Sequence, residues 1–171
     1  LNTRIQALVA HPTQPGTVYA GGDTGLFVSH DSGATWARTG QQGDLPTIWS
    51  LAIDPLSPDT LFAGTRPAGV FRSRDAGRTW QQLDLDIAPE CAIGKPFVTA
   101  LVVDPDDSRI VWAGVEIDGV FRSTDGGETW KKILYVNDKA GAADLILDPS
   151  NPRILYASTW NMKRNGYRMD S

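Results

Sequence analysis

The hydrophobic pattern of the chain is a short apolar run that ends at a proline, and it occurs four times. The runs read IQALVAHP at residues 5–12, IWSLAIDP at 48–55, VTALVVDP at 98–105 and AADLILDP at 142–149. Each run has the length of a buried strand, and proline cannot donate to the next step of a strand ladder. The closing prolines at 12, 55, 105 and 149 are 43, 50 and 44 residues apart. A period of this length predicts a repeated supersecondary unit.

Further strand patterns follow each run at fixed distances. The second segments are TVYAG (17–21), TLFAG (60–64), IVWAG (110–114) and ILYAS (154–158), with an aromatic residue at one shared position. The third segments, GLFVS (25–29), GVFRS (69–73) and GVFRS (119–123), alternate as half-buried strands do, and a fourth strand begins at Trp36, Trp80 and Trp130. Four short antiparallel strands in roughly 45 residues are typical of a propeller blade. We therefore predict an all-β fold with three complete blades and a partial fourth.

The repeat boundaries predict one partial β-propeller over residues 1–171. Its blades are expected at approximately 5–40, 48–85, 98–134 and 142–171, the last of them incomplete. The connector between the second and third blades is longer than the others because of an insertion at residues 84–97. Extra length on a repeat scaffold usually lies on one face, often the binding face.

The third and fourth strands are joined by one motif, Ser-x-Asp-x-Gly-x-Thr-Trp, called the box turn below. It reads SHDSGATW at 29–36, SRDAGRTW at 73–80 and STDGGETW at 123–130. The aspartate can accept hydrogen bonds from turn amides, the glycine permits positive φ, and the threonine favours a return to extended backbone. The tryptophan can wedge under the turn or between blades. This structural role is assigned to Ser29, Asp31, Gly33, Thr35, Trp36, Ser73, Asp75, Gly77, Thr79, Trp80, Ser123, Asp125, Gly127, Thr129 and Trp130.

These three motifs resemble the Asp box, or bacterial neuraminidase repeat, of sialidase-like β-propellers. Proteins that carry the box include sialidases, xyloglucanases, sortilin-type receptor ectodomains, a photosystem II assembly factor and many uncharacterised bacterial propellers. In that family the box is structural and lies on the face opposite the active site. The resemblance therefore implies that the box aspartates are not catalytic, and it implies an extracytoplasmic location.

The candidate functional face is the end of the blades opposite the box turns. Because strand direction alternates, the loops between second and third strands gather there with the connectors between blades. The ligand-binding candidates on this face are Asp23, Trp49, Arg66, Glu90, Lys95, Trp160 and Arg164. The two tryptophans could stack on a sugar ring or pack within the blades.

Glu116 and Asp118 are the candidate catalytic residues. Glycoside hydrolysis needs two carboxyl groups held across a sugar, and these two lie close together in one loop. The alternative is that they are ordinary solvated hairpin residues. A sialidase would also need an arginine cluster and an Arg-Ile-Pro segment, which the sequence Arg4-Ile5-Gln6 does not match.

Composition excludes several classes of partner. The net charge is −4 without any basic run, which argues against nucleic acid or an anionic membrane surface. No apolar stretch approaches the roughly 20 residues that a membrane span needs, so membrane insertion is not expected. Cys91 is the only cysteine, and with His11 and His30 it supplies no zinc ligand set. We expect neither a metal nor a cofactor.

Three functions fit this sequence. The first is a non-catalytic propeller scaffold for binding or assembly, part of a larger propeller, with protein or polysaccharide partners. The second is a fragment of a secreted glycoside hydrolase, closer to a xyloglucanase than to a sialidase, and the third is a purely structural fragment. An open propeller exposes two sheet faces and an unpaired edge, so we also expect self-association that closes the ring.

Overall fold

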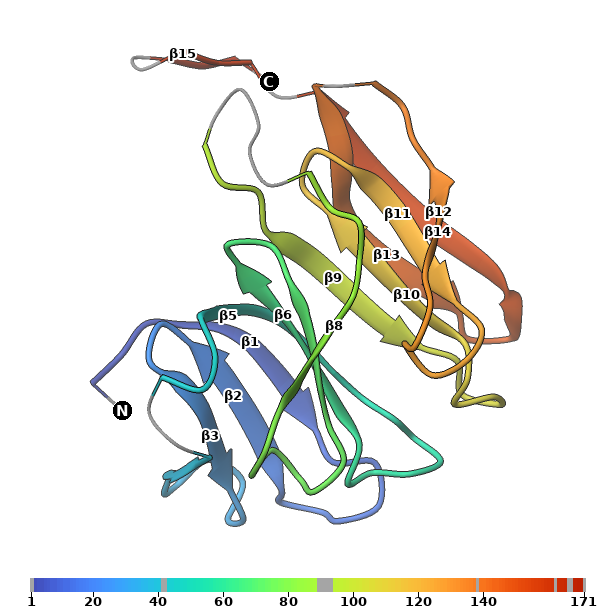
Figure 1. Ribbon diagram of the computed structural model, residues 1–171. Helices are drawn as coiled ribbons and strands as arrows, with labels where there is room; N and C mark the ends of the chain where they lie inside the picture. Colours follow the sequence, from blue (N-terminus) through green and yellow to red (C-terminus); the bar gives the residue numbers. More distant parts are fainter. Residues whose placement is uncertain are drawn as a thin grey trace.

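The chain folds into a row of antiparallel sheets (Figure 1). The computed structural model describes residues 2–40, 43–88, 94–137 and 139–161, with the backbone of two short strands beyond them. Over these ranges the chain forms strands, turns and bends, and no helix. Three sheets have four strands each, and a two-stranded sheet follows them. The prediction of three complete blades and a partial fourth is confirmed.

Strand order follows chain order within every blade. Blade 1 contains β1 (Ile5–Ala10), β2 (Val18–Gly22), β3 (Gly25–Ser29) and β4 (Ala37–Thr39). Blade 2 contains β5 (Thr47–Ile53), β6 (Leu61–Arg66), β7 (Val70–Ser73) and β8 (Gln81–Leu83). Blade 3 contains β9 (Val98–Val103), β10 (Val111–Val115), β11 (Gly119–Ser123) and β12 (Lys131–Leu134). Partial blade 4 is β13 (Ala140–Asp148) with β14 (Asn151–Asn161), and β15 (Lys163–Asn165) pairs with β16 (Arg168–Asp170).

The core lies between the blades because each sheet is apolar on both faces. In β7, Val70 belongs to the cluster shared with blade 3, whereas its neighbour Phe71 belongs to the cluster shared with blade 1. The shared aromatic position of the second strands shows how far a covering blade buries this residue. Tyr19, Phe62 and Trp112 are 4%, 1% and 6% exposed, whereas Tyr156 of β14 is 54% exposed. Within the described residues, no other blade covers the outer face of blade 4.

Each box turn is held by hydrogen bonds within the motif. In blade 3, Asp125 Oδ1 accepts hydrogen bonds from Ser123 Oγ (2.7 Å) and the Thr129 amide (2.9 Å), and Oδ2 accepts one from Thr129 Oγ1 (2.5 Å). Ser123 Oγ accepts the Gly127 amide at 2.8 Å, and the Trp130 indole donates to the Gly127 carbonyl at 2.9 Å. The turns at 29–36 and 73–80 repeat these bonds. The tryptophan thus lies under its own turn.

The box turns share one end of the blades with the proline-ended loops. In each blade the amide of the fourth box residue donates to a carbonyl in the loop between the first and second strands. The three pairs are Ser32 to Gly16 (2.9 Å), Ala76 to Asp59 (2.9 Å) and Gly126 to Arg109 (2.8 Å). This arrangement leaves the opposite end of the blades to the other loops.

The residue before each proline caps its loop, a role that sequence reasoning missed. Asp54 Oδ1 accepts the amides of Leu56 and Ser57 at 2.9 and 3.2 Å, as an Asx turn does. Asp54 Oδ1 also accepts a hydrogen bond from Ser108 Oγ of blade 3 at 2.8 Å. The first blade has His11 at this position, and its Nδ1 accepts the amides of residues 13 and 14.

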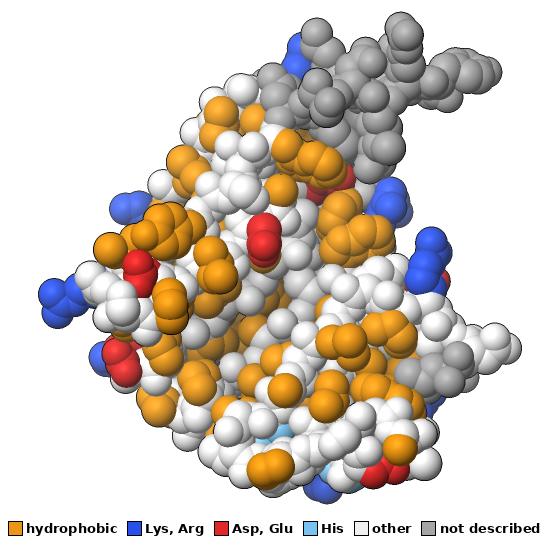
Figure 2. Space-filling model, turned by 180° about the vertical axis from the view of Figure 1, so that it is seen from behind, with side chains coloured by type: hydrophobic (Ala, Val, Ile, Leu, Met, Phe, Trp, Pro, Cys, Tyr) orange, Lys and Arg blue, Asp and Glu red, His pale blue; other side chains and the backbone are white. Residues whose placement is uncertain are grey.

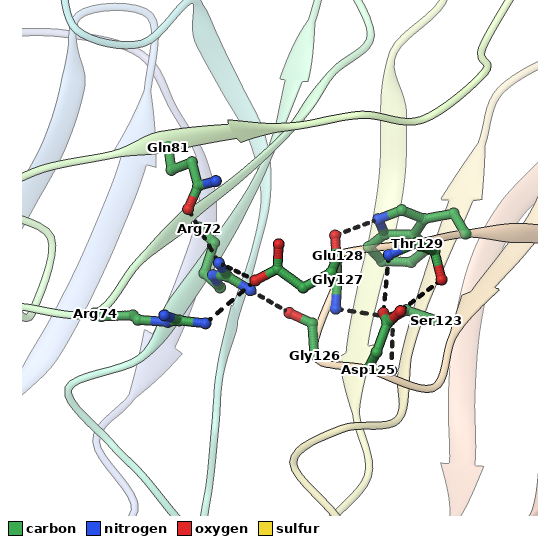
Figure 3. A network of polar contacts seen from close by, with 10 residues as sticks. Arg72, Arg74, Gln81, Ser123, Asp125, Gly126, Gly127, Glu128 and Thr129 are labelled. Carbon is green, nitrogen blue, oxygen red and sulfur yellow. Dashed lines mark hydrogen bonds and ion pairs between the residues drawn. The ribbon is translucent and has the colours of Figure 1, made fainter.

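Blades 2 and 3 are also joined by a buried arginine (Figure 3). The Arg72 side chain, 3% exposed, reaches from β7 to the box turn of the next blade. Its guanidinium donates to the Gly126 carbonyl at 2.7 Å, to Glu128 Oε1 at 2.7 Å and to Gln81 Oε1 at 3.0 Å. Arg74 adds a longer contact to the same glutamate at 3.4 Å. A buried guanidinium needs such partners, so this interface requires the neighbouring turn.

Two residues of each box turn have positive φ, although only the glycine was expected to. The residue before the box glycine has φ of 59° in Ser32, 58° in Ala76 and 73° in Gly126. Side chains with a Cβ are disfavoured in this region. We predict that Ala76→Gly raises the free energy of unfolding by about 0.5–1 kcal/mol, and that Gly126→Ala lowers it by a similar amount. Urea denaturation measures both, and a change of the same sign in the two variants would contradict the turn geometry.

The box carboxylates predict a stability loss in acid. Hydrogen bonds from the threonine hydroxyl and amide, with others from the turn, lower the pKa of Asp31, Asp75 and Asp125 to about 2. A depressed pKa stabilises the fold above the unfolded pKa near 4, and this stabilisation is lost as the pH falls towards 2. The unfolding free energy should therefore fall between about pH 4 and pH 2. Asp75→Asn should flatten this pH dependence, and an unchanged slope in that variant would refute the assignment.

Candidate functional site

The first strand of every blade has an extra residue near the end opposite the box turns. In blade 2, Ile48 pairs with Thr65 and Ser50 pairs with Gly64, so the residue between them is a β-bulge. The four bulge residues are Gln6, Trp49, Thr99 and Ala143. A bulge bends its strand and redirects a side chain. The bulge therefore sets which side chain each blade offers at this end.

Trp49 lies in a cluster with two other side chains at the end of the blades opposite the box turns. Its ring centroid is 4.2 Å from that of Phe97, with the planes tilted by 46°. The Arg66 guanidinium lies 5.9 Å from the Trp49 centroid and 5.8 Å from that of Phe97. Arg66 is exposed, Trp49 is partly buried and Phe97 is buried. Trp49, the accessible ring of the pair, can stack on a sugar ring, and the exposed Arg66 guanidinium can donate hydrogen bonds to the sugar oxygens.

The loop that carries Arg66 is held by its neighbours. Thr65 Oγ1 donates to the Pro67 carbonyl at 2.8 Å, and the Thr65 amide donates to the Gly69 carbonyl at 3.0 Å. Phe97 is the last residue of the insertion at 84–97, and its carbonyl accepts the Glu116 amide at 3.0 Å. The cluster therefore joins blade 2 to the start of blade 3. Hydrogen bonds hold the backbone beside Arg66 and at Phe97.

Glu116 and Asp118 are buried, with exposures of 3% and 7%. The solvated-hairpin alternative is therefore wrong for both. Asp118 Oδ2 accepts the Ala88 amide at 3.1 Å, and Oδ1 pairs with the Lys132 ammonium. Both Asp118 oxygens thus bind this chain's own groups and fasten residues 84–88 to blade 3.

The remaining ligand-binding candidates are dispersed. Asp23 accepts hydrogen bonds from Gln6 and Arg4, each at 3.1 Å, and these lower the pKa of its carboxyl group. Lys95 is exposed in the insertion, and Trp160 is 44% exposed near the end of β14. Glu90 and the Arg164 side chain lie outside the described residues.

Of the predicted site residues, the structure brings Trp49 and Arg66 together. Sequence reasoning missed Phe97, which stood in the sequence as an ordinary flank of a strand, and Lys132, the partner of Asp118. The β-bulges left no sequence signal because Gln6, Trp49 and Thr99 share no residue type.

Two kinds of feature are absent from the described part of the chain. Nowhere in it do three His, Cys, Asp or Glu side chains gather closely enough to hold a metal ion. It also contains no helix that is long and apolar enough to cross a membrane.

A protein-family model matches residues 24–135, which extend from the β2–β3 turn to just beyond β12. The model is Sortilin-Vps10, described as sortilin, neurotensin receptor 3. It matches well over half of the chain.

Known proteins share the sequence over part of the chain. A xyloglucanase of Hypocrea jecorina is 35% identical over 78 residues, which are 45% of this chain and 9% of the xyloglucanase. A probable oligoxyloglucan-reducing end-specific xyloglucanase of Neosartorya fischeri is 29% identical over 94 residues, 46% of this chain and 11% of that protein. The match thus spans about a tenth of these curated relatives.

Solved structures share the fold over most of the chain. The crystal structure of an ancestral GH74 enzyme has a TM-score of 0.74 at 21% identity and covers 91% of this chain and 22% of its own. YCF48 bound to D1 peptide has a TM-score of 0.65 at 16% identity, with coverage of 86% and 46%. At identities this low, the structural similarity shows a common fold alone.

Proposed function

The chain belongs to the sortilin-Vps10 family. From this premise we propose that it is a non-catalytic propeller scaffold and part of a larger propeller. It would bind a polysaccharide at the end of its blades opposite the box turns. The observation that carries the proposal is the cluster of Trp49, Phe97 and Arg66. The three boxes act in this proposal as Asp boxes, fixing the opposite end of a single propeller domain.

Binding is favoured over catalysis by the state of the two candidate carboxyl groups. A general acid or a nucleophile must reach the sugar, whereas Glu116 and Asp118 are 3% and 7% exposed. Asp118 is also committed to the Ala88 amide and to Lys132. By contrast, Arg66 is exposed beside the partly buried Trp49 ring, and an accessible aromatic ring next to a hydrogen-bond donor suits sugar recognition.

A β-glucan of the xyloglucan type is the ligand that we propose. It is supported by the xyloglucanase with which the chain shares 35% identity over 78 residues. Aromatic rings stack on the apolar faces of such sugars, and arginine donates hydrogen bonds to their hydroxyl oxygens. A protein ligand is the alternative partner, supported by the fold shared with YCF48, which was solved with a bound peptide.

The binding proposal is tested by titrating the chain with xyloglucan oligosaccharides in a calorimeter. We expect Trp49→Ala to weaken binding at least about tenfold, which corresponds to about 1.4 kcal/mol. Tyr156→Ala is the matched control because Tyr156 is an exposed aromatic residue of β14 outside the cluster, and it should bind like the parent. Absence of binding by the parent chain, or equal affinity of Trp49→Ala, would reject the proposal.

A glycoside hydrolase fragment is the second candidate, favoured by the same xyloglucanase similarity. It requires that Glu116 and Asp118 become accessible when further blades complete the site. Turnover of xyloglucan by the chain, lost in Glu116→Gln and Asp118→Asn with the melting temperature preserved, would establish it. Turnover that persists in both variants would reject these residues as the catalytic pair.

A further inference from the structure

A groove of about 600 Å³ lies between blade 3 and β14, away from the Trp49 cluster. Blade 3 contributes Trp112, Val120, Arg122 and Leu134 to its walls, and β14 contributes Leu155 and Ala157. In Figure 2, hydrophobic side chains gather over the half of the molecule that carries blade 4, and again over the half that carries blade 1. The groove is therefore a mainly apolar surface, and its charged lining residues are Asp104, Arg122 and Arg153.

Arg122, a partly buried residue of the groove, corresponds to Arg72. Both are the fourth residue of a Gly-Val-Phe-Arg-Ser segment, in β11 and β7. The two terminal nitrogens of Arg72 donate to the Gly126 carbonyl and to Glu128, both in the next box turn. The Arg122 Nε is buried, and no described residue accepts a hydrogen bond from it. An unsatisfied buried donor is costly, so this position calls for an acceptor.

The apolar wall of the groove also corresponds to the surface of blade 2 that the next box turn covers. In blade 2, the box glycine of the next blade packs on Leu83 and Phe62, since a Cβ at Gly127 would lie 2.7 Å from Leu83 Cδ1 and 3.5 Å from Phe62 Cε1. Leu83 pairs with Val70 as Leu134 pairs with Val120. Leu83 is 5% exposed under its covering turn, whereas Leu134 is 37% exposed.

We propose that this groove binds a β-hairpin of another polypeptide whose turn is a box with glutamate immediately before the threonine. The turn would offer a carbonyl and a carboxylate to the terminal nitrogens of the Arg122 guanidinium, as Gly126 and Glu128 do to those of Arg72. Its glycine would lie on Leu134 and Trp112. The strand before the turn would pair with β14, whose partner among the described strands is β13.

The boxes of this chain argue against a second copy as the occupant. The residue before the threonine is Ala34 in the first box and Arg78 in the second, so neither supplies a carboxylate. Glu128 of the third box is already bound by Arg72. Arg153 and Asp104 also line the groove, so with Arg122 its lining carries one net positive charge, which favours a carboxylate on the turn that faces it. This groove is separate from the proposed glycan site, so failure of either proposal leaves the other intact.

The test uses the full chain and a synthetic peptide with the sequence of residues 119–134, GVFRSTDGGETWKKIL. A version cyclised end to end removes part of the entropy cost of closing the hairpin. Calorimetric titration should show binding that weakens at least about tenfold in Arg122→Met, or when the peptide glutamate is replaced by glutamine. A peptide of residues 25–39, which has alanine at that position, should also bind more weakly.

Arg109→Met is the control, because Arg109 is exposed and pairs with Asp107 outside the groove. It should bind the peptide like the parent chain, and circular dichroism confirms that both variants are folded. Failure of both the linear and the cyclic peptide to bind would overturn the proposal, as would binding that Arg122→Met leaves unchanged. Dimers of the chain that the peptide dissociates would assign the groove to a second copy instead.

Discussion

An aspartate that accepts hydrogen bonds from a serine and a threonine of its own turn fixes the backbone at one end of every complete blade. In blade 3, Asp125 binds the Ser123 hydroxyl and both the amide and the hydroxyl of Thr129. The turn so formed presents the Gly126 carbonyl and the Glu128 carboxylate in one direction, towards blade 2. Because Arg72 is 3% exposed, it depends on those two acceptors. The internal bonds of a turn thus control the contact between blades.

Much of this architecture could be predicted from the sequence because it depends on local chemistry. Apolar runs of strand length, the turn residues and the shared aromatic position are each readable from a few neighbouring residues. The positive φ of Ala76 was not predictable, since alanine carries no preference for that region. The role of Asp54 was hidden for a different reason. Its carboxylate caps a turn and also accepts a hydrogen bond from Ser108, 54 residues away, which no local pattern encodes.

The candidate site was less predictable because it is assembled across blades. Trp49 and Arg66 were both placed at the loop end, but Phe97 joins them from the end of the insertion. The burial of Glu116 and Asp118 follows from contacts with residues 84–88 and Lys132, which the spacing of two carboxylates in one loop does not reveal. The repeats also allow equivalent residues of different blades to be compared. Comparing Arg122 with Arg72 indicates which acceptors the Arg122 side chain would need, because Arg72 has its acceptors in the next box turn.

Blade 2 is bound to blade 3 through Arg72 and the adjoining box turn. A double-mutant cycle of Arg72→Met and Glu128→Gln, with unfolding free energies from urea denaturation, measures that coupling directly. We predict that the two changes together lower the free energy of unfolding by less than the sum of the single changes, with a coupling energy of about 1 kcal/mol. Additive effects, with a coupling energy close to zero, would show that the Arg72–Glu128 pair does not hold blades 2 and 3 together, and would contradict this role of the arginine.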